Sequence, residues 1–129
     1  MTKKQDKFKE GLKFDGDKLR WDLLPYDAVN EIVKVLTYGA IKYEPRNWEK
    51  GMNWSRAYGA LQRHMTKWFH GQENDEESGL SHLAHAGCCL MFLLGWYTRN
   101  TGHDDRPKLP ENTLSNMDNT KFMEKLKHK

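Results

Sequence analysis

Histidines set at helical spacing among apolar residues, between positions 57 and 89, constrain this chain more than any other sequence feature. Positions three or four apart share one face of a helix, so His82 and His85 point the same way and Cys89 continues their face. A second such face consists of Ala57, Ala60, Leu61, His64, Met65 and Trp68. If the two helices pack antiparallel through these faces, the three histidines lie in one interior.

A run of acids connects the two histidine-bearing segments and contains Asp75 and Glu77. Imidazoles and carboxylates are metal-ligand types, and a divalent cation held among them could face a phosphorylated substrate. The plain alternative is that each histidine is a hydrogen-bonded core residue and that the acids form a solvated turn near a helix N-terminus. Because the groups converge, we interpret them as a candidate metal site. Its candidate ligands are His64, Asp75, Glu77, His82 and His85.

The periodicity predicts an all-α protein, a compact bundle of three main helices over residues 28–43, 55–70 and 78–99. The third is apolar nearly all round and should be the most buried. Residues 12–107 form the single domain, which begins with a small hairpin or an extended strap. Residues 1–11 are expected to be a flexible arm, and residues 108–129 an irregular tail with one weak amphipathic segment.

Net charge and hydropathy limit the partners and the cellular compartment that we expect for the protein. The net charge of +3 is mild and the lysines gather at the two ends, so binding to nucleic acid is not expected. The longest apolar run, residues 88–94, is too short to cross a bilayer, and the N-terminus has no signal-peptide pattern, which predicts a cytoplasmic protein without membrane contact. Cys88 and Cys89 are adjacent on a helix, where an ordinary structural disulfide cannot form.

Polar residues outside the histidine-rich stretch supply candidates for binding a ligand. Trp48 beside Asn47, in the loop after the first helix, offers a stacking plane and hydrogen-bonding groups suited to a nucleobase, although Trp48 could equally cap the core. Lys18 and Arg20, beside the turn of the strap, could touch a ligand or be solvated. His103 and Asp104 invite comparison with HD phosphohydrolases, but few residues follow that could complete such a site.

Several motifs together resemble a known family. They are Lys13-Phe14-Asp15 through Lys18, Leu24-Pro25, Tyr38-Gly39-Ala40-x-Lys42-Tyr43, Asn47-Trp48, Gly51, Arg63-His64, Asp75-x-Glu77-Ser78-Gly79-Leu80, His82-Leu83-x-His85-Ala86 and Asp104-Asp105-Arg106-Pro107. Over residues 12–107 the chain resembles small, mostly phage-borne proteins described as dATP/dGTP diphosphohydrolase-like and related to the MazG group. That resemblance implies an all-helical, magnesium-dependent enzyme that hydrolyses nucleoside triphosphates to monophosphates and pyrophosphate.

The sequence departs from the MazG pattern at its ligands. MazG-like sites use Glu-x-x-Glu on one helix and Glu-x-x-Asp on another, whereas this chain offers His82-x-x-His85, and Gln72 stands where similar proteins often have Glu. Imidazole suits a transition metal better than it suits Mg2+, so Mn2+, Co2+ or Zn2+ are alternatives to Mg2+.

These patterns combine into one functional prediction, the metal-dependent hydrolysis of a purine deoxynucleoside triphosphate by a homo-oligomer. Lys42 and Arg63 are expected to neutralise the phosphates, and Glu77 to deprotonate water. The base or sugar is expected to contact Tyr43, Asn47 and Trp48, and the segment Asp104, Asp105 and Arg106 to fold back to the site. The alternatives are a non-enzymatic phage or prophage accessory protein, which binds nucleic acid or a partner, and an HD-type phosphohydrolase.

Overall fold

The computed structural model describes residues 10–128, and within them all regular structure is helical. The four α-helices are α1 (Tyr26–Lys42), α2 (Trp54–Phe69), α3 (His82–Arg99) and α4 (Thr120–Lys127), and short 3-10 turns are η1 (Trp21–Leu23), η2 (Asn47–Lys50) and η3 (Ser115–Met117). The predicted all-α class is therefore confirmed. The first nine residues of the predicted arm lie outside the described range.

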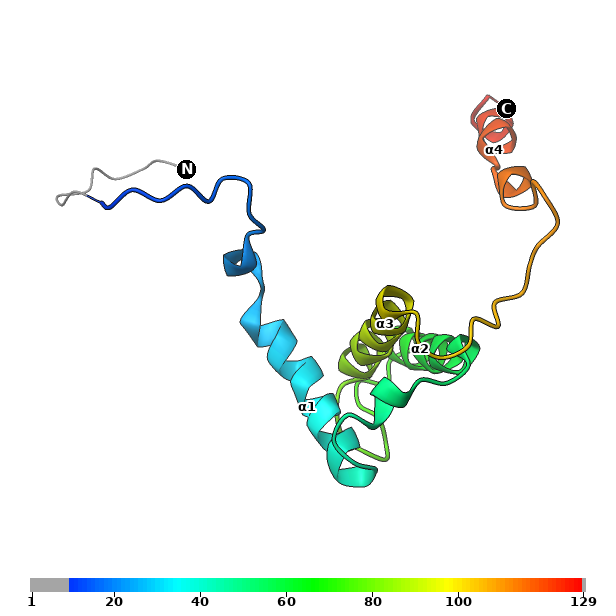
Figure 1. The fold of residues 1–129 in the computed structure, drawn as a ribbon. Helices are drawn as coiled ribbons and strands as arrows, with labels where there is room; N and C mark the ends of the chain where they lie inside the picture. The colour runs from blue at the N-terminus through cyan, green and yellow to red at the C-terminus, as the bar shows by residue number, and fades with distance from the viewer. Residues whose placement is uncertain (1–9, 129) are drawn as a thin grey trace.

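Helix α3 lies at the centre and packs against both α1 and α2 (Figure 1). The core joins Val35 of α1 to Ala84 and Cys88 of α3, with Ile32 and Phe92 packed around them. Helices α2 and α3 run antiparallel, because Trp54 at the start of α2 contacts Tyr97 near the end of α3. The predicted role of the third helix as the most buried one is borne out by this arrangement.

The start of α3 is set by Ser81, whose hydroxyl accepts hydrogen bonds from the backbone N–H groups of Leu83 and Ala84 at 3.1 and 3.3 Å. Such a serine N-cap satisfies donors that have no partner within the helix. Gly79 just before it has a φ of 73°, which a right-handed helix cannot contain. The helix therefore begins at His82, and the predicted start at Ser78 was too early.

The two connections that flank the helical pair are tied to each other. Gly51 and Gly102 both have positive φ, and a Cβ on Gly51 would lie 2.7 Å from the Cα of Gly102. Close by, the indole Nε1 of Trp54 donates to the carbonyl of Thr101 at 2.9 Å, and Asn53 forms an isolated β-bridge with His103. The end of α3 is thereby fastened to the beginning of α2.

Both ends of the described chain extend away from the helical core (Figure 1). Residues 10–24 form an extended strap that contains a turn, in which Lys18 N–H donates to the Asp15 carbonyl, and then η1; no hairpin forms within it. The amphipathic segment expected within the tail is helical and forms α4, just before which Asp118 accepts a hydrogen bond from Thr120 N–H. Between residues 10 and 128 no helix combines the length and the hydropathy that a membrane span requires.

Candidate functional site

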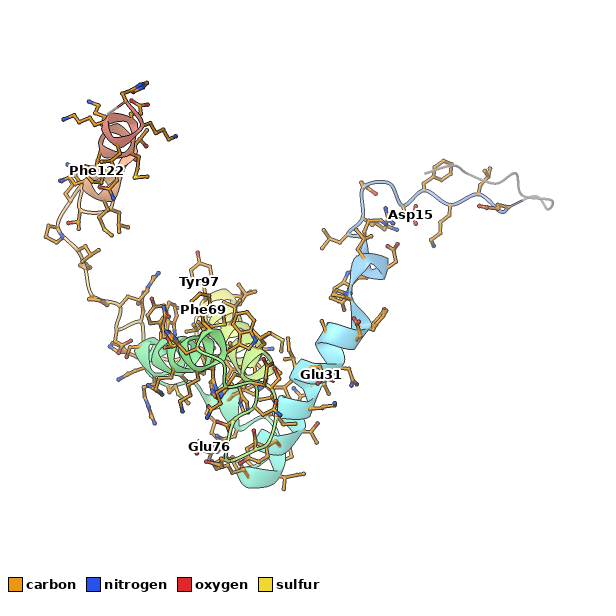
Figure 2. The ribbon with its side chains drawn as sticks, turned by 180° about the vertical axis from the view of Figure 1, so that it is seen from behind. Asp15, Glu31, Phe69, Glu76, Tyr97 and Phe122 are labelled. Atoms are coloured by element: carbon orange, nitrogen blue, oxygen red, sulfur yellow. The ribbon has the colours of Figure 1, made fainter. Side chains whose placement is uncertain are left out.

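A pocket of about 330 Å³ opens between the C-terminal half of α1, the η2 turn and α3. Its floor is apolar and includes Leu36, Cys88 and Phe92. Polar groups line its rim from α1, from α2 and from the loop after α2; that loop carries Glu76 and lies beside the C-terminal end of α1 (Figure 2). The charged and imidazole side chains that line it are Lys42, Glu44, Arg46, His64, Asp75, Glu77 and His85.

Three histidines meet at one side of this pocket, as the apolar helix faces predict. The Nδ1 atoms of His64 and His82 are 2.8 Å apart, and the rings of His64 and His85 stack with centroids separated by 4.5 Å. His82 is completely buried. One nitrogen each from His64 and His82 and one carboxylate oxygen of Asp75 lie within 4.8 Å of one another, close enough for all three to bind one cation.

The proton of His82 is placed by a chain of hydrogen bonds that starts at Glu76. The Glu76 carboxylate only accepts, so it orients the Gln72 amide, whose Nε2 donates to it at 3.2 Å. Gln72 Oε1 then faces His82 Nε2 at 2.6 Å, and that nitrogen must donate. With its proton on Nε2, His82 is an acceptor at Nδ1 and receives the 2.8 Å hydrogen bond from His64 Nδ1; a cation bound at His82 Nδ1 would replace that hydrogen bond.

Asp75 and Ser78 form the other wall of the histidine cluster. The Asp75 carboxylate accepts from Ser78 N–H at 2.9 Å, and the Ser78 hydroxyl lies 2.7 Å from His85 Nε2. The Ser78 hydroxyl also accepts from Leu80 N–H at 3.1 Å, and the tautomer of His85 decides which of Ser78 and His85 donates in their contact. His85 Nε2 is thus occupied by a neutral partner and is 4.0 Å from the nearer Asp75 oxygen.

Burial, first of all, keeps the imidazoles of His64 and His85 uncharged near neutral pH. The pKa of His64 falls to about 4, chiefly because burial disfavours its charged form and secondly because of neighbouring His85 and His82. Burial likewise lowers the pKa of His85. For Asp75, burial acts to raise the pKa, but hydrogen bonds from Ser78 and the nearby histidines outweigh it, so the net shift is downward. Neutral imidazoles and an ionised carboxylate are the forms that bind metal ions.

Glu77, two residues after Asp75, joins the loop to α1. Its carboxylate accepts from the Tyr38 hydroxyl and pairs with the Lys42 ammonium. Those two partners, Lys42 first, hold the pKa of Glu77 below its usual range, while Glu77 raises the pKa of Lys42. The pair therefore remains charged at neutral pH.

Trp48 forms the inner edge of the pocket and is held by α3. Its ring stacks on Phe92 with centroids 4.9 Å apart, and the Arg99 guanidinium lies 5.2 Å over it. Phe92 and Arg99 are two turns apart and contact the ring on either side of Gly95, against which the ring edge rests. Of the two interpretations of Trp48, capping of the core is thus the one that its packing supports.

Comparison with known proteins places these residues in a described family. A model of the family described as dATP/dGTP diphosphohydrolase, N-terminal, matches residues 9–106. The chain belongs to that family. A dATP/dGTP diphosphohydrolase of Salmonella phage PMBT28 is 34% identical to it over 96 residues. The alignment covers 74% of this chain and 33% of the relative, so the chain spans about a third of that relative's length. No solved structure matches.

Within this member of the family, the structure brings most of the predicted site residues to one pocket. Those that line it are Lys42, Tyr43, Asn47, Trp48, His64, Asp75, Glu77 and His85, and His82 lies directly behind His64. Tyr43 is 65% exposed at the rim and contacts the Lys42 ammonium through its ring face.

The segment 104–106 and Arg63 lie elsewhere. Asp105 accepts from the backbone N–H and the hydroxyl of Ser55 at the start of α2, and Asp104 pairs with Arg106 at 2.7 Å. The His103 backbone pairs with the segment before α2, and neither His103 nor Asp104 belongs to the cluster of metal-ligand groups found among residues 10–128. Arg63 is exposed and is not part of the pocket lining.

Sequence reasoning missed Tyr38, Arg46 and Ser78 as site residues and did not give Gln72 a role. Arg46 lines the pocket and has a left-handed backbone conformation (φ 61°), and no sequence pattern predicted this conformation. Gln72 and Ser78 could have been found, because both flank the acidic run that the histidine argument had already singled out.

Proposed function

We propose that this domain hydrolyses a purine deoxynucleoside triphosphate to the monophosphate and pyrophosphate, with a divalent transition metal held by His64, Asp75 and His82. The observation that carries the proposal is the convergence of these three donors at the wall of a nucleotide-sized pocket. The family description and the name of the phage relative supply the reaction class.

The donor set itself favours particular metals. Two imidazole nitrogens and one carboxylate oxygen suit Zn2+, Mn2+ or Co2+, whereas Mg2+ prefers a shell of oxygen ligands. When bound there, such an ion would stabilise negative charge on phosphate oxygens and lower the pKa of water. His85, whose Nε2 faces the Ser78 hydroxyl, is assigned a place beside the ion and not in its ligand set.

We assign the remaining pocket residues to different parts of the substrate. Lys42 and Arg46 lie where the phosphate charges would be neutralised, and Arg46 takes the part first expected of Arg63. The apolar floor at Leu36 and Phe92 would receive the base, and Tyr43 and Asn47 would contact the base or the sugar at the rim. Glu77, ionised and fixed by Tyr38, is positioned to accept a proton from water.

Product analysis tests the proposal. The purified chain is incubated with each of the eight common nucleoside triphosphates and with Mg2+, Mn2+, Co2+ or Zn2+, and the products are separated. We expect pyrophosphate and a deoxynucleoside monophosphate from dATP or dGTP with a transition metal. Release of single phosphate or of triphosphate, or no turnover with any pair, would refute the proposed reaction.

A further inference from the structure

The strap carries several large apolar side chains that pack against nothing in residues 10–128. Leu12, Phe14 and Leu19 are 84–90% exposed, and Trp21 is 73% exposed. Side chains of this size are rarely left in water along a whole segment. They require a surface that the described part of the chain does not offer.

The total surface of the chain points the same way. The chain exposes 11711 Å² at a mass of 15.2 kDa, whereas a compact folded monomer of that mass exposes about 7,100 Å². Residues 1–9 and 129 can contribute at most about 1,700 Å² even as a fully exposed chain. The C-terminal segment that extends from the core (Figure 1) accounts for part of the remaining surplus, and the strap and α1 account for another part. Obligate homodimers bury roughly 2,000–5,000 Å² in total, about half of it on each chain.

Helix α1 carries an apolar stripe that is distinct from the one facing α3. Tyr26, Val29 and Val33 recur at intervals of three and four residues on its N-terminal half, and Tyr26 and Val33 are 70% and 45% exposed, whereas Leu36 further along packs on the core. Two such stripes can pack antiparallel about a two-fold axis. Antiparallel pairing sets the N-terminal end of one α1 beside the C-terminal end of the other, which is where the pocket opens.

The pocket has fewer cationic side chains than the charge of a triphosphate requires. Its charged lining consists of two cations, Lys42 and Arg46, and three carboxylates, Glu44, Asp75 and Glu77. Both cations already have carboxylate partners, Glu77 for Lys42 and Glu49 for Arg46. In the strap, Lys13 and Lys18 take part in no ion pair formed within residues 10–128.

We propose that two copies of the chain pair through the exposed stripe of α1, and that the strap of each copy brings Lys13 and Lys18 to the phosphate end of its partner's pocket. The assignment of a phosphate to the pocket rests on the proposed function. The second copy completes the site, and the apolar strap residues pack against the partner's helices.

Sedimentation velocity tests the pairing. Val33→Glu places a charge in the stripe, and Lys34→Gln changes the net charge by the same amount on the polar side of α1, where Lys34 pairs with Glu31. We expect dimers for the wild type and Lys34→Gln, and monomers with unchanged helical circular dichroism for Val33→Glu. A monomeric wild type, or dimeric Val33→Glu, would overturn the proposal.

Mixed dimers test the shared site without relying on turnover. One chain carries Lys13→Ala and Lys18→Ala, the other carries Lys42→Ala, and heterodimers are purified through two affinity tags. Inorganic tripolyphosphate is the probe, measured by calorimetry. Each variant homodimer should bind it at least tenfold more weakly than the wild type, while the heterodimer should regain one tight site per dimer. A Lys121→Ala, Lys125→Ala chain is the charge-matched control and should bind as the wild type does.

The outcomes separate the two proposals. A heterodimer with no tight site would show that the strap does not act on its partner, whatever the wild-type turnover. A heterodimer that regains its site, in a protein that hydrolyses no nucleotide, would leave the shared site standing and refute the proposed reaction alone.

Discussion

At the scale of single residues, hydrogen-bond polarity decides which nitrogen of His82 faces the site. Glu76 orients Gln72, and Gln72 holds the proton of His82 on Nε2. A fully buried imidazole fixed in this way directs its Nδ1 toward His64, where a cation would replace the hydrogen bond between the two rings. The apolar face of α3 explains why His82 is buried, and the hydrogen bond to the Gln72 amide explains why its Nδ1 faces His64.

Replacement of Gln72 by methionine tests this orientation. The His82 Nε2–H would lose its acceptor, at a cost to folding of about 1–3 kcal/mol for a buried donor. The affinity for Co2+, measured by competition with a chelating dye, should fall about 10- to 100-fold, as for other outer hydrogen-bond partners. Gln62→Met, which removes an exposed hydrogen bond to Tyr58, is the control and should leave the affinity unchanged.

Glu77 offers a second test at this scale. Glu77→Gln keeps the shape of the side chain and removes the charge that pairs with Lys42. If Glu77 accepts a proton from water, kcat should fall about 100-fold or more, as expected for the loss of a general base. Glu31→Gln, which breaks an exposed pair with Lys34, should retain its turnover. Equal turnover in the two variants would remove Glu77 from the mechanism.

At the scale of elements, the extent and faces of the helices could be predicted from the sequence, and the contacts between their ends could not. Periodicity identified α1, α2 and α3 because each buries one face, and it correctly grouped His64 with His82 and His85. The Tyr38 contact with Glu77 joins residues 39 apart, and no local pattern specifies such a meeting. For the same reason Asp105 was expected in the site, although it binds the start of α2.

Substitution by alanine should change the stability of the protein in opposite directions at two helical glycines, Gly95 and Gly39. An added Cβ at Gly95 would lie 2.9 Å from the Trp48 ring, whereas nothing lies within 4 Å of one at Gly39. Gly95→Ala should therefore destabilise the protein by about 1–3 kcal/mol through overpacking. Gly39→Ala should stabilise it by about 0.5–1 kcal/mol, because alanine favours the helix. Urea unfolding measures both, and destabilisation of similar size in the two variants would contradict the assigned packing of Trp48.

Asp105 provides a pH-dependent test of its structural role. Hydrogen bonds from the Ser55 hydroxyl and N–H lower its pKa, so its stabilising effect is complete above the unfolded value of about 3.9 and is lost as the pH falls through the lower folded value. Asp105→Asn should lower the melting temperature by a few degrees at pH 7 and flatten the loss of stability in acid. Tripolyphosphate affinity should not change. A selective loss of affinity would instead return Asp105 to the site.

At the scale of the whole molecule, α3 organises the site by packing against both other core helices. Its N-terminal end supplies His82 and His85, its middle supplies the pocket floor, and its C-terminal end anchors Trp48 through Arg99. The family match over residues 9–106 contains all of these parts and the strap, but not α4. The apolar surface left on α1 and the strap is the part of the molecule that a second copy would cover.

Equilibrium dialysis against Co2+ or Mn2+, followed by metal analysis, tests the central claim most directly. Asp75→Asn removes one proposed ligand without changing its shape, and Asp104→Asn removes a carboxylate that pairs only with Arg106 outside the pocket. We predict one ion per chain for the wild type and Asp104→Asn, and at least tenfold weaker binding for Asp75→Asn. A wild type that binds no ion at micromolar free metal, or an Asp75→Asn protein that binds as the wild type does, would contradict it.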